Sequence, residues 1–222
     1  MAFGCGLAGL VACILRWRLL RAGADEKGLL VAGQFPEIAG NVLTALVFLV
    51  TALCLWKHRK IKITVRESAA ATAARVLAFI LGAILFWKMS SLGKAAAMAA
   101  VLAAAVALAG VLGKHLPQVM EDIPALLFFM LSLLSCYRVW SAEPELQRYS
   151  YRLAALVSLM LATYHRSAIS AGLAKGPLFL AASFLGIYFA FAASADPGYT
   201  VLFLALGLWA TAQLEAATEE TE

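Results

Sequence analysis

One run of nineteen residues without a charge, AAAMAAVLAAAVALAGVLG at 95–113, constrains the fold of this chain more than any other feature. A helix of about 20 apolar residues crosses the roughly 30 Å hydrocarbon core of a bilayer. A strand of a membrane β-barrel would instead alternate apolar and polar residues over about ten positions, and this run does not alternate. The run therefore predicts a transmembrane helix.

Similar apolar segments recur along the whole chain of 222 residues. Charged residues make up only 14% of the chain, whereas a soluble domain carries about 25%, and they gather in short clusters between the apolar segments. We count eight segments, at 1–20, 36–56, 68–90, 94–114, 122–141, 145–171, 175–195 and 198–216. The predicted fold is an all-α polytopic transmembrane helix bundle with about eight spans. Seven is the alternative count, because the first segment is the weakest.

The expected domain organisation is one transmembrane domain at 1–216 followed by a short, solvated acidic tail at 217–222. The first segment lacks the basic start of a signal peptide, so we expect a retained helix. The prolines support the segment boundaries, because all fall at segment starts or in connections: Pro36, Pro117, Pro124, Pro144, Pro177 and Pro197. An acid followed by proline is typical of a helix start, so the sixth helix is expected to begin at Pro144. The sequence ADPG at 195–198 predicts a turn.

Basic residues near segment ends are expected to reach the lipid headgroups by snorkelling, as for Arg16 and Arg75. No acidic residue lies near the middle of a segment, which disfavours a proton-coupled pump with a midplane carboxylate. The basic cluster KHRKIKITVR at 57–66 predicts a cytoplasmic connection, and with eight spans both termini are then cytoplasmic. The basic residues of the first connection oppose this orientation. The style of the sequence suggests a bacterial protein of the plasma membrane.

The motifs indicate helix packing rather than cofactor chemistry. GCGLAG at 4–9 matches G-x-G-x-x-G, but no strand precedes it and it lies in an apolar segment, so close packing through small residues is the better interpretation. The same spacing at Ala99, Ala103 and Ala107 predicts that the fourth helix is internal to the bundle. No C-x-x-C pair occurs, so neither a disulfide framework nor a zinc site is expected, and no metal or cofactor is predicted.

Candidate ligand-binding residues cluster around the fifth and sixth segments. Tyr137, Arg138 and Trp140 close the fifth, and Tyr164 and His165 lie toward the end of the sixth. A belt of interfacial aromatic and basic residues accounts for most of them without a ligand. A pocket between the two helices, facing the polar stripe Ser132–Cys136–Trp140, is the alternative.

Three functions are consistent with these observations. The leading hypothesis is a non-enzymatic small-molecule carrier, or the membrane subunit of a transporter, because a helix bundle can form a pocket between its helices. The alternatives are a lipid-modifying membrane enzyme that uses His165 near the interface, and a non-catalytic structural or regulatory subunit. Catalytic motifs are absent, which favours a non-enzyme. The net charge of +5 suits anionic headgroups better than nucleic acid. Membrane lipids are the expected partners, with a small-molecule ligand, a membrane protein or a second copy as further candidates.

Overall fold

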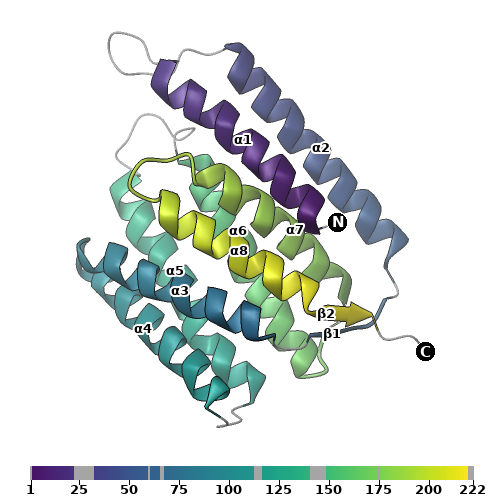
Figure 1. Cartoon of the computed structure of the whole chain (residues 1–222), viewed down its shortest axis with the longest axis vertical. Coiled ribbons are helices and arrows are strands. Elements are labelled where there is room, and N and C mark those ends of the chain that lie inside the picture. Colours follow the sequence, from purple (N-terminus) through teal and green to yellow (C-terminus); the bar gives the residue numbers. More distant parts are fainter. Residues whose placement is uncertain are drawn as a thin grey trace.

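The computed structural model describes residues 2–22, 33–59, 61–65, 68–112, 117–140, 149–174 and 176–219. Within these ranges the chain forms eight helices and two short strands, and Figure 1 shows the α1–α2 hairpin on one side and α3 and α4 on the other. The helices are α1 (Ala2–Ala22), α2 (Phe35–Lys57), α3 (Ala69–Trp87), α4 (Ser91–Val111), α5 (Gln118–Trp140), α6 (Ser150–Ser170), α7 (Gly176–Ala193) and α8 (Thr200–Glu215), and the strands are β1 (Ile63–Val65) and β2 (Ala217–Glu219). The predicted all-α bundle of about eight helices is confirmed.

Six of the described helices, α1 to α5 and α7, are long and apolar enough to cross a membrane. Helix α8 is apolar but has only 16 residues. Helix α6 has 21 residues and contains the two arginines Arg152 and Arg166, which lower its hydropathy. Both arginines are buried in the bundle, so the helix that looks least like a membrane span carries its two charged side chains inward.

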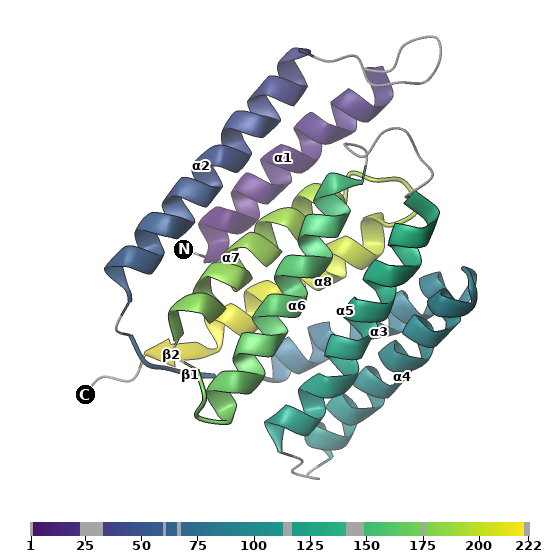
Figure 2. The same ribbon diagram turned by 180° about the vertical axis from the view of Figure 1, so that it is seen from behind.

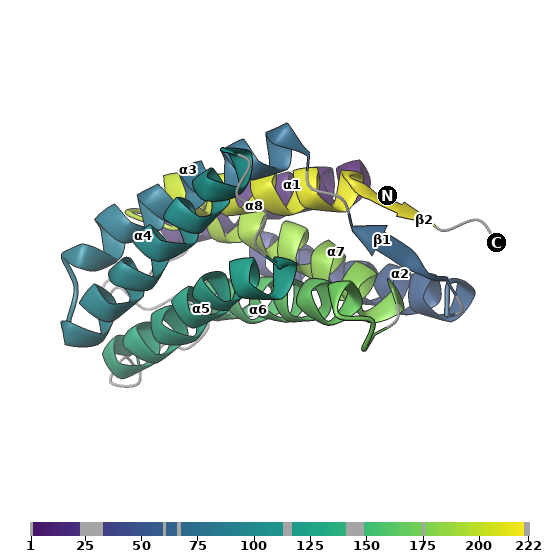
Figure 3. The same cartoon turned by 90° about the horizontal axis from the view of Figure 1, so that it is seen from below.

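Helices α3 to α8 form a closed ring, since each packs against the next in sequence and α8 packs against α3. Seen from below, α3 and α8 lie in one layer and α5 and α6 in the other, with α4 at one edge (Figure 3). Aromatic side chains of α3, α5 and α8 fill the ring. Phe79 contacts Phe128 edge-on at a centroid distance of 5.3 Å, and Phe129 stacks on Trp209 at 6.1 Å. All four are almost fully buried, so the ring has a solid aromatic core.

The α1–α2 hairpin packs outside this ring, mainly against α7. Small residues allow the close approach. An added Cβ at Gly9 would lie 2.8 Å from both the Phe191 Cβ and the Tyr188 carbonyl oxygen, whereas one at Gly4 would meet nothing within 4 Å. The interpretation of GCGLAG as a helix-packing segment is thus supported at Gly9, although Gly4 takes no part.

Helix α4 differs from its prediction. Ala99, Ala103 and Ala107 are buried against neighbouring helices, as their spacing suggested, but Met98 and Val101 on the other side are well exposed. The prediction that this helix is internal to the bundle is therefore wrong. Most alanines of α4 line the face toward α3 and α5, and its larger side chains face the surroundings, as suits a helix at the edge of a bundle in lipid.

Two predicted helix starts need correction or lie outside the described residues. Helix α5 begins at Gln118, so Pro124 is inside the helix rather than at its start. Proline has no N–H to donate, which leaves the carbonyl of Met120 without its helical hydrogen bond. Pro144 lies in 141–148, outside the described residues, and α6 begins at Ser150.

Strands β1 and β2 pair antiparallel, with Ile63 opposite Glu219 and Val65 opposite Ala217. The first residues of the acidic tail therefore pair with a strand. The pairing joins the residues just before α3 to those just after α8, at the end of the bundle where Figure 1 shows both chain termini.

Candidate functional site

The five residues predicted to bind a ligand do not form one site. Tyr137 and Arg138 are exposed near the end of α5, Tyr164 is exposed, and His165 is half-buried near the end of α6. The side chain of Trp140 lies outside the described residues. Helices α5 and α6 are antiparallel neighbours (Figure 2), so the two groups are separated by roughly 15 Å along the helices, at 1.5 Å per residue. Ligand binding by these residues stays a prediction.

The surroundings of His165 offer no chemical partner among the described residues. Its ring packs edge-on against that of Tyr164 at 5.3 Å, and its buried Nδ1 has no hydrogen-bond partner there. No group of three His, Cys, Asp or Glu side chains in the described part of the chain is placed to hold a metal. The stripe of Ser132 and Cys136 is fully buried, while the Tyr164 side chain points outward.

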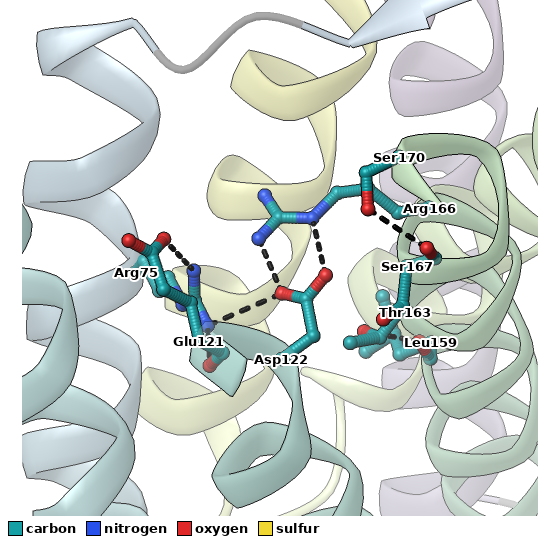
Figure 4. Close-up of polar contacts among 8 residues, drawn as sticks. All are labelled: Arg75, Glu121, Asp122, Leu159, Thr163, Arg166, Ser167 and Ser170. Atoms are coloured by element: carbon teal, nitrogen blue, oxygen red, sulfur yellow. Dashed lines mark hydrogen bonds and ion pairs between the residues drawn. The ribbon is translucent and has the colours of Figure 1, made fainter. Parts of the chain in front are cut away.

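A charged cluster lies inside the ring, and Figure 4 shows it between α3, α5 and α6. Asp122, which is fully buried, accepts from Arg166 Nε at 3.1 Å through Oδ2 and from Arg166 Nη2 through Oδ1. Arg75 Nη2 donates to the same Oδ1 at 3.3 Å and to the Glu121 carbonyl oxygen at 2.5 Å. We name these four residues, together with Gln213, the Asp122 cluster. With its amide oxygen toward Arg166, Gln213 accepts from Nη1 at 2.6 Å and from Nε at 2.9 Å.

The Asp122 cluster overturns one prediction. Arg75 does not snorkel to the headgroups, because it is 1% exposed and points into the ring. Arg166 is likewise buried. An unpaired charge in a low-dielectric interior costs several kcal/mol, so each arginine is held where a carboxylate compensates it.

A second cluster lies at the opposite end of the bundle, where α7 turns into α8. Asp196 accepts from Arg16 Nε at 3.0 Å through Oδ1 and from Arg152 Nε at 2.5 Å through Oδ2. The predicted turn positions this acid: the Asp196 carbonyl accepts from the Tyr199 N–H at 3.2 Å, and Gly198 has φ +84°. Proline followed by a glycine with positive φ is typical of a type II turn.

Tyrosine rings surround the arginines of this second cluster. Arg16 Cζ lies 4.7 Å from the centroid of Tyr151, and Arg152 Cζ lies 4.9 Å from that of Tyr149 and 4.6 Å from that of Tyr199. Such cation–π contacts stabilise a desolvated cation. We name these three rings with Arg16, Arg152 and Asp196 the Asp196 cluster. Arg16, like Arg75, was expected to snorkel, and this prediction is also wrong because the side chain is buried.

Cavities follow the seam between the α1–α2 hairpin and the ring. A polar cavity of about 80 Å³ borders the Asp196 cluster, lined by Arg16, Glu37, Asn41 and Tyr151 among others. The next cavity is apolar, with a volume of about 320 Å³, and lies between Cys5 and Ala8 of α1, Val47 and Thr51 of α2 and Phe184 of α7. Phe184 and Cys54 also line a third cavity of about 350 Å³, which includes His58 and Glu215 at the other end of the bundle.

Hydroxyl groups connect α2 with the ring between the polar and the apolar cavity. Thr44 Oγ1 lies 2.8 Å from the Tyr188 hydroxyl and 3.1 Å from the Tyr151 hydroxyl, and it donates to the Gly40 carbonyl at 2.8 Å. Tyr188 is fully buried. This network is a polar link across the seam, and it shares the Tyr151 ring with Arg16, whose Cζ lies 4.7 Å from the ring centroid.

Sequence reasoning missed the Asp196 and Asp122 clusters, although a signal was present. An ionisable residue inside an apolar segment is by default a candidate for a buried functional or structural role, and Arg75 and Arg166 fit that description. Their partners could not be named from the sequence, because Arg16 and Asp196 are 180 positions apart.

No protein-family model, curated protein or solved structure matches this chain. The fold and its six apolar spans define a multi-pass helical membrane protein. Any more specific role has to be argued from the seam and the two clusters.

Proposed function

We propose that this protein is a small-molecule carrier, or the membrane subunit of one, and that its substrate occupies the seam between the α1–α2 hairpin and the ring. One observation carries the proposal: three cavities follow one another along the hairpin from the Arg16 end of the bundle to the His58 end. The hairpin packs from outside, mainly on α7, so it can shift without opening the aromatic core.

The alternatives have less support. A lipid-modifying enzyme needs a base, acid or metal beside His165. Among the described residues its Nδ1 has no hydrogen-bond partner, and no group of three metal-binding side chains is found. A structural subunit needs no cavities, and the seam then has no role.

A blocking variant tests the carrier role. Purified protein in liposomes is incubated with an isotope-labelled metabolite extract, and accumulated compounds are measured by mass spectrometry. We expect one class of compound to be enriched over protein-free liposomes. Cys54→Trp, which fills the junction of two cavities, should reduce this enrichment to background. Leu53→Trp on the exposed side of the same helix should keep at least half of it. Absence of any enrichment, or equal loss in both variants, would overturn the proposal.

We place the protein in a bacterial plasma membrane with both termini in the cytoplasm. The dense basic segment at 57–66 supports this orientation. In a cysteine-free background, an impermeant maleimide added to whole cells should label Lys88→Cys in the α3–α4 connection and leave His58→Cys unlabelled. The opposite pattern would reverse the orientation.

A further inference from the structure

We infer that the ligand of the seam is an amphiphile with one hydrocarbon chain and an anionic head group, a carboxylate or a phosphate. This inference rests on the proposed function for the location of the ligand and adds its chemical class. It follows from the polar cavity at Arg16 and the apolar cavity at Val47, which lie end to end on one face of each hairpin helix.

The residues that line the two cavities form a stripe along each hairpin helix, and the hydroxyl network of Thr44 lies between the two cavities. On α1 the lining residues recur every three or four positions, which places them on one helix face: Cys5, Ala8, Ala12, Arg16 and Leu19. On α2 the lining residues include a row with the same spacing, Glu37, Gly40, Leu43, Val47, Thr51 and Cys54, with Pro36, Asn41, Leu46 and Val50 beside it. From Cys5 to Leu19 the stripe is about 21 Å long at 1.5 Å per residue. An amphiphile with one chain, its head group included, matches a stripe of this length.

The apolar half fits a hydrocarbon chain. Its volume of about 320 Å³ is at the lower end of the roughly 300–1,000 Å³ of ligand pockets, which suits one chain better than two. Leu46 and Val50 line it and are about half exposed, so it opens sideways toward the bilayer. A chain that enters from lipid exchanges one apolar environment for another and needs no aqueous path.

The polar half offers an anionic head the guanidinium of Arg16, which is also paired with Asp196. Arg16 is 6% exposed, borders the cavity, and has a second guanidinium, Arg152, on the other side of Asp196. The carboxylate of Glu37 also lines the cavity and accepts from the Gly33 N–H through Oε2 at 2.8 Å, so an anionic head has to lie on the Arg16 side, away from Glu37. Asn41 adds an amide and Tyr151 a hydroxyl, which are neutral hydrogen-bonding groups for the oxygens of a head group.

A series of four probes with the same sixteen-carbon chain tests this assignment. The heads are carboxylate, phosphate, hydroxyl and trimethylammonium, and retention on immobilised full-length protein in phosphatidylcholine nanodiscs is measured by mass spectrometry. We expect one or both anionic probes to bind at least about tenfold more tightly than the neutral and cationic probes, a difference that corresponds to one charge-assisted contact. Tighter binding of the carboxylate probe would indicate a fatty acid, and tighter binding of the phosphate probe would indicate a lysophospholipid.

Variants separate the site from adsorption to the lipid. Val47→Phe fills the apolar cavity and should weaken retention of the anionic probe at least about tenfold, whereas Val42→Phe on the exposed side of the same helix should change it less than twofold. Ala8→Leu fills the same cavity from α1 and serves if Val47→Phe does not fold. Asn41→Leu should weaken binding of the anionic probes without affecting the neutral one.

Two results would overturn the inference: equal retention of all four probes, or equal effects of Val47→Phe and Val42→Phe. The proposed function fails separately. Selective amphiphile binding without any enrichment in the liposome assay would leave this inference standing and remove the carrier role. Enrichment of a water-soluble compound without amphiphile binding would leave the carrier role standing and remove this inference.

Discussion

Asp122 and Asp196 place the same ion-pair chemistry at opposite ends of the bundle. Each is fully buried and accepts from two arginines. The Asp122 cluster joins α3, α5, α6 and α8, all members of the ring. The Asp196 cluster joins α1 of the hairpin to α6 and the α7–α8 turn, and Arg16 borders a cavity. The Asp122 cluster therefore joins helices within the ring, whereas the similar contacts of the Asp196 cluster attach the hairpin to the ring beside a cavity.

The largest expected effect is on the Asp122 cluster. Asp122→Ala leaves Arg75 and Arg166 without this carboxylate in the interior, and breaking a buried ion pair in this way costs about 3–5 kcal/mol. We expect a strongly lowered midpoint of thermal unfolding and a loss of monodisperse protein in detergent. Glu215→Ala, which removes an exposed acid, is the control. Equal midpoints for the two variants would show that the cluster does not stabilise the ring.

Asp196→Ala should cost less, about 2 kcal/mol, because Tyr151 and Tyr199 still cover the two guanidinium groups. The loss of stability should be confined to the contact between the hairpin and the ring. Cys13 lies 3.3 Å from the Ser194 hydroxyl, so its rate of thiol labelling reports hairpin detachment in a protein whose other cysteines are replaced. We expect faster labelling of Cys13 after Asp196→Ala and unchanged labelling after Glu215→Ala. If Asp196→Ala destabilises as much as Asp122→Ala, the two clusters have the same role.

Gly9→Ala tests the hairpin contact without touching a charge. The new Cβ meets backbone and Cβ atoms of α7 at 2.8 Å, so α1 must move away, at a cost of about 1 kcal/mol, toward the lower end of overpacking penalties. Gly4→Ala meets nothing within 4 Å and should be neutral or slightly stabilising through helix propensity. Thermal unfolding of the two variants checks this, and an identical midpoint would contradict the close packing of α1 on α7.

The smallest effect is expected for the hydroxyl network. Thr44→Val removes the contacts to Tyr151 and Tyr188, and hydrogen bonds between membrane helices contribute about 0.6 kcal/mol each. Thr211→Val, which loses only a bond to Gly207 in its own helix, is the matched control. A double-mutant cycle with Tyr188→Phe measures the coupling energy between Thr44 and Tyr188. A coupling energy of zero would show that their hydrogen bond does not stabilise the contact between the hairpin and the ring.

The sequence predicted the helices well and their arrangement poorly. Length and hydropathy determine a span locally, which is why the eight segments agree with the helices to within a few residues at most ends. Packing depends on partners far apart in the chain. Arg75 was assigned to the headgroups because snorkelling requires only the helix that carries it, whereas its true position requires Asp122, 47 residues later. Tyr137 and His165 were predicted to bind a ligand because of their residue types. Residue type does not determine which ends of two neighbouring helices lie side by side.

The pairing of β1 with β2 has a consequence for how the chain can be divided. The residues before α3 and after α8 are hydrogen-bonded to each other, so the ring begins and ends at the same place, and the hairpin is connected to it through one covalent link at 58–62. A cut in that link breaks no helix–helix contact. We expect residues 1–59 and 61–222, produced as separate fragments, to reassemble through Gly9 and the Arg16–Asp196 pair. Such a split protein would allow the hairpin to be exchanged, labelled or withheld independently of the ring.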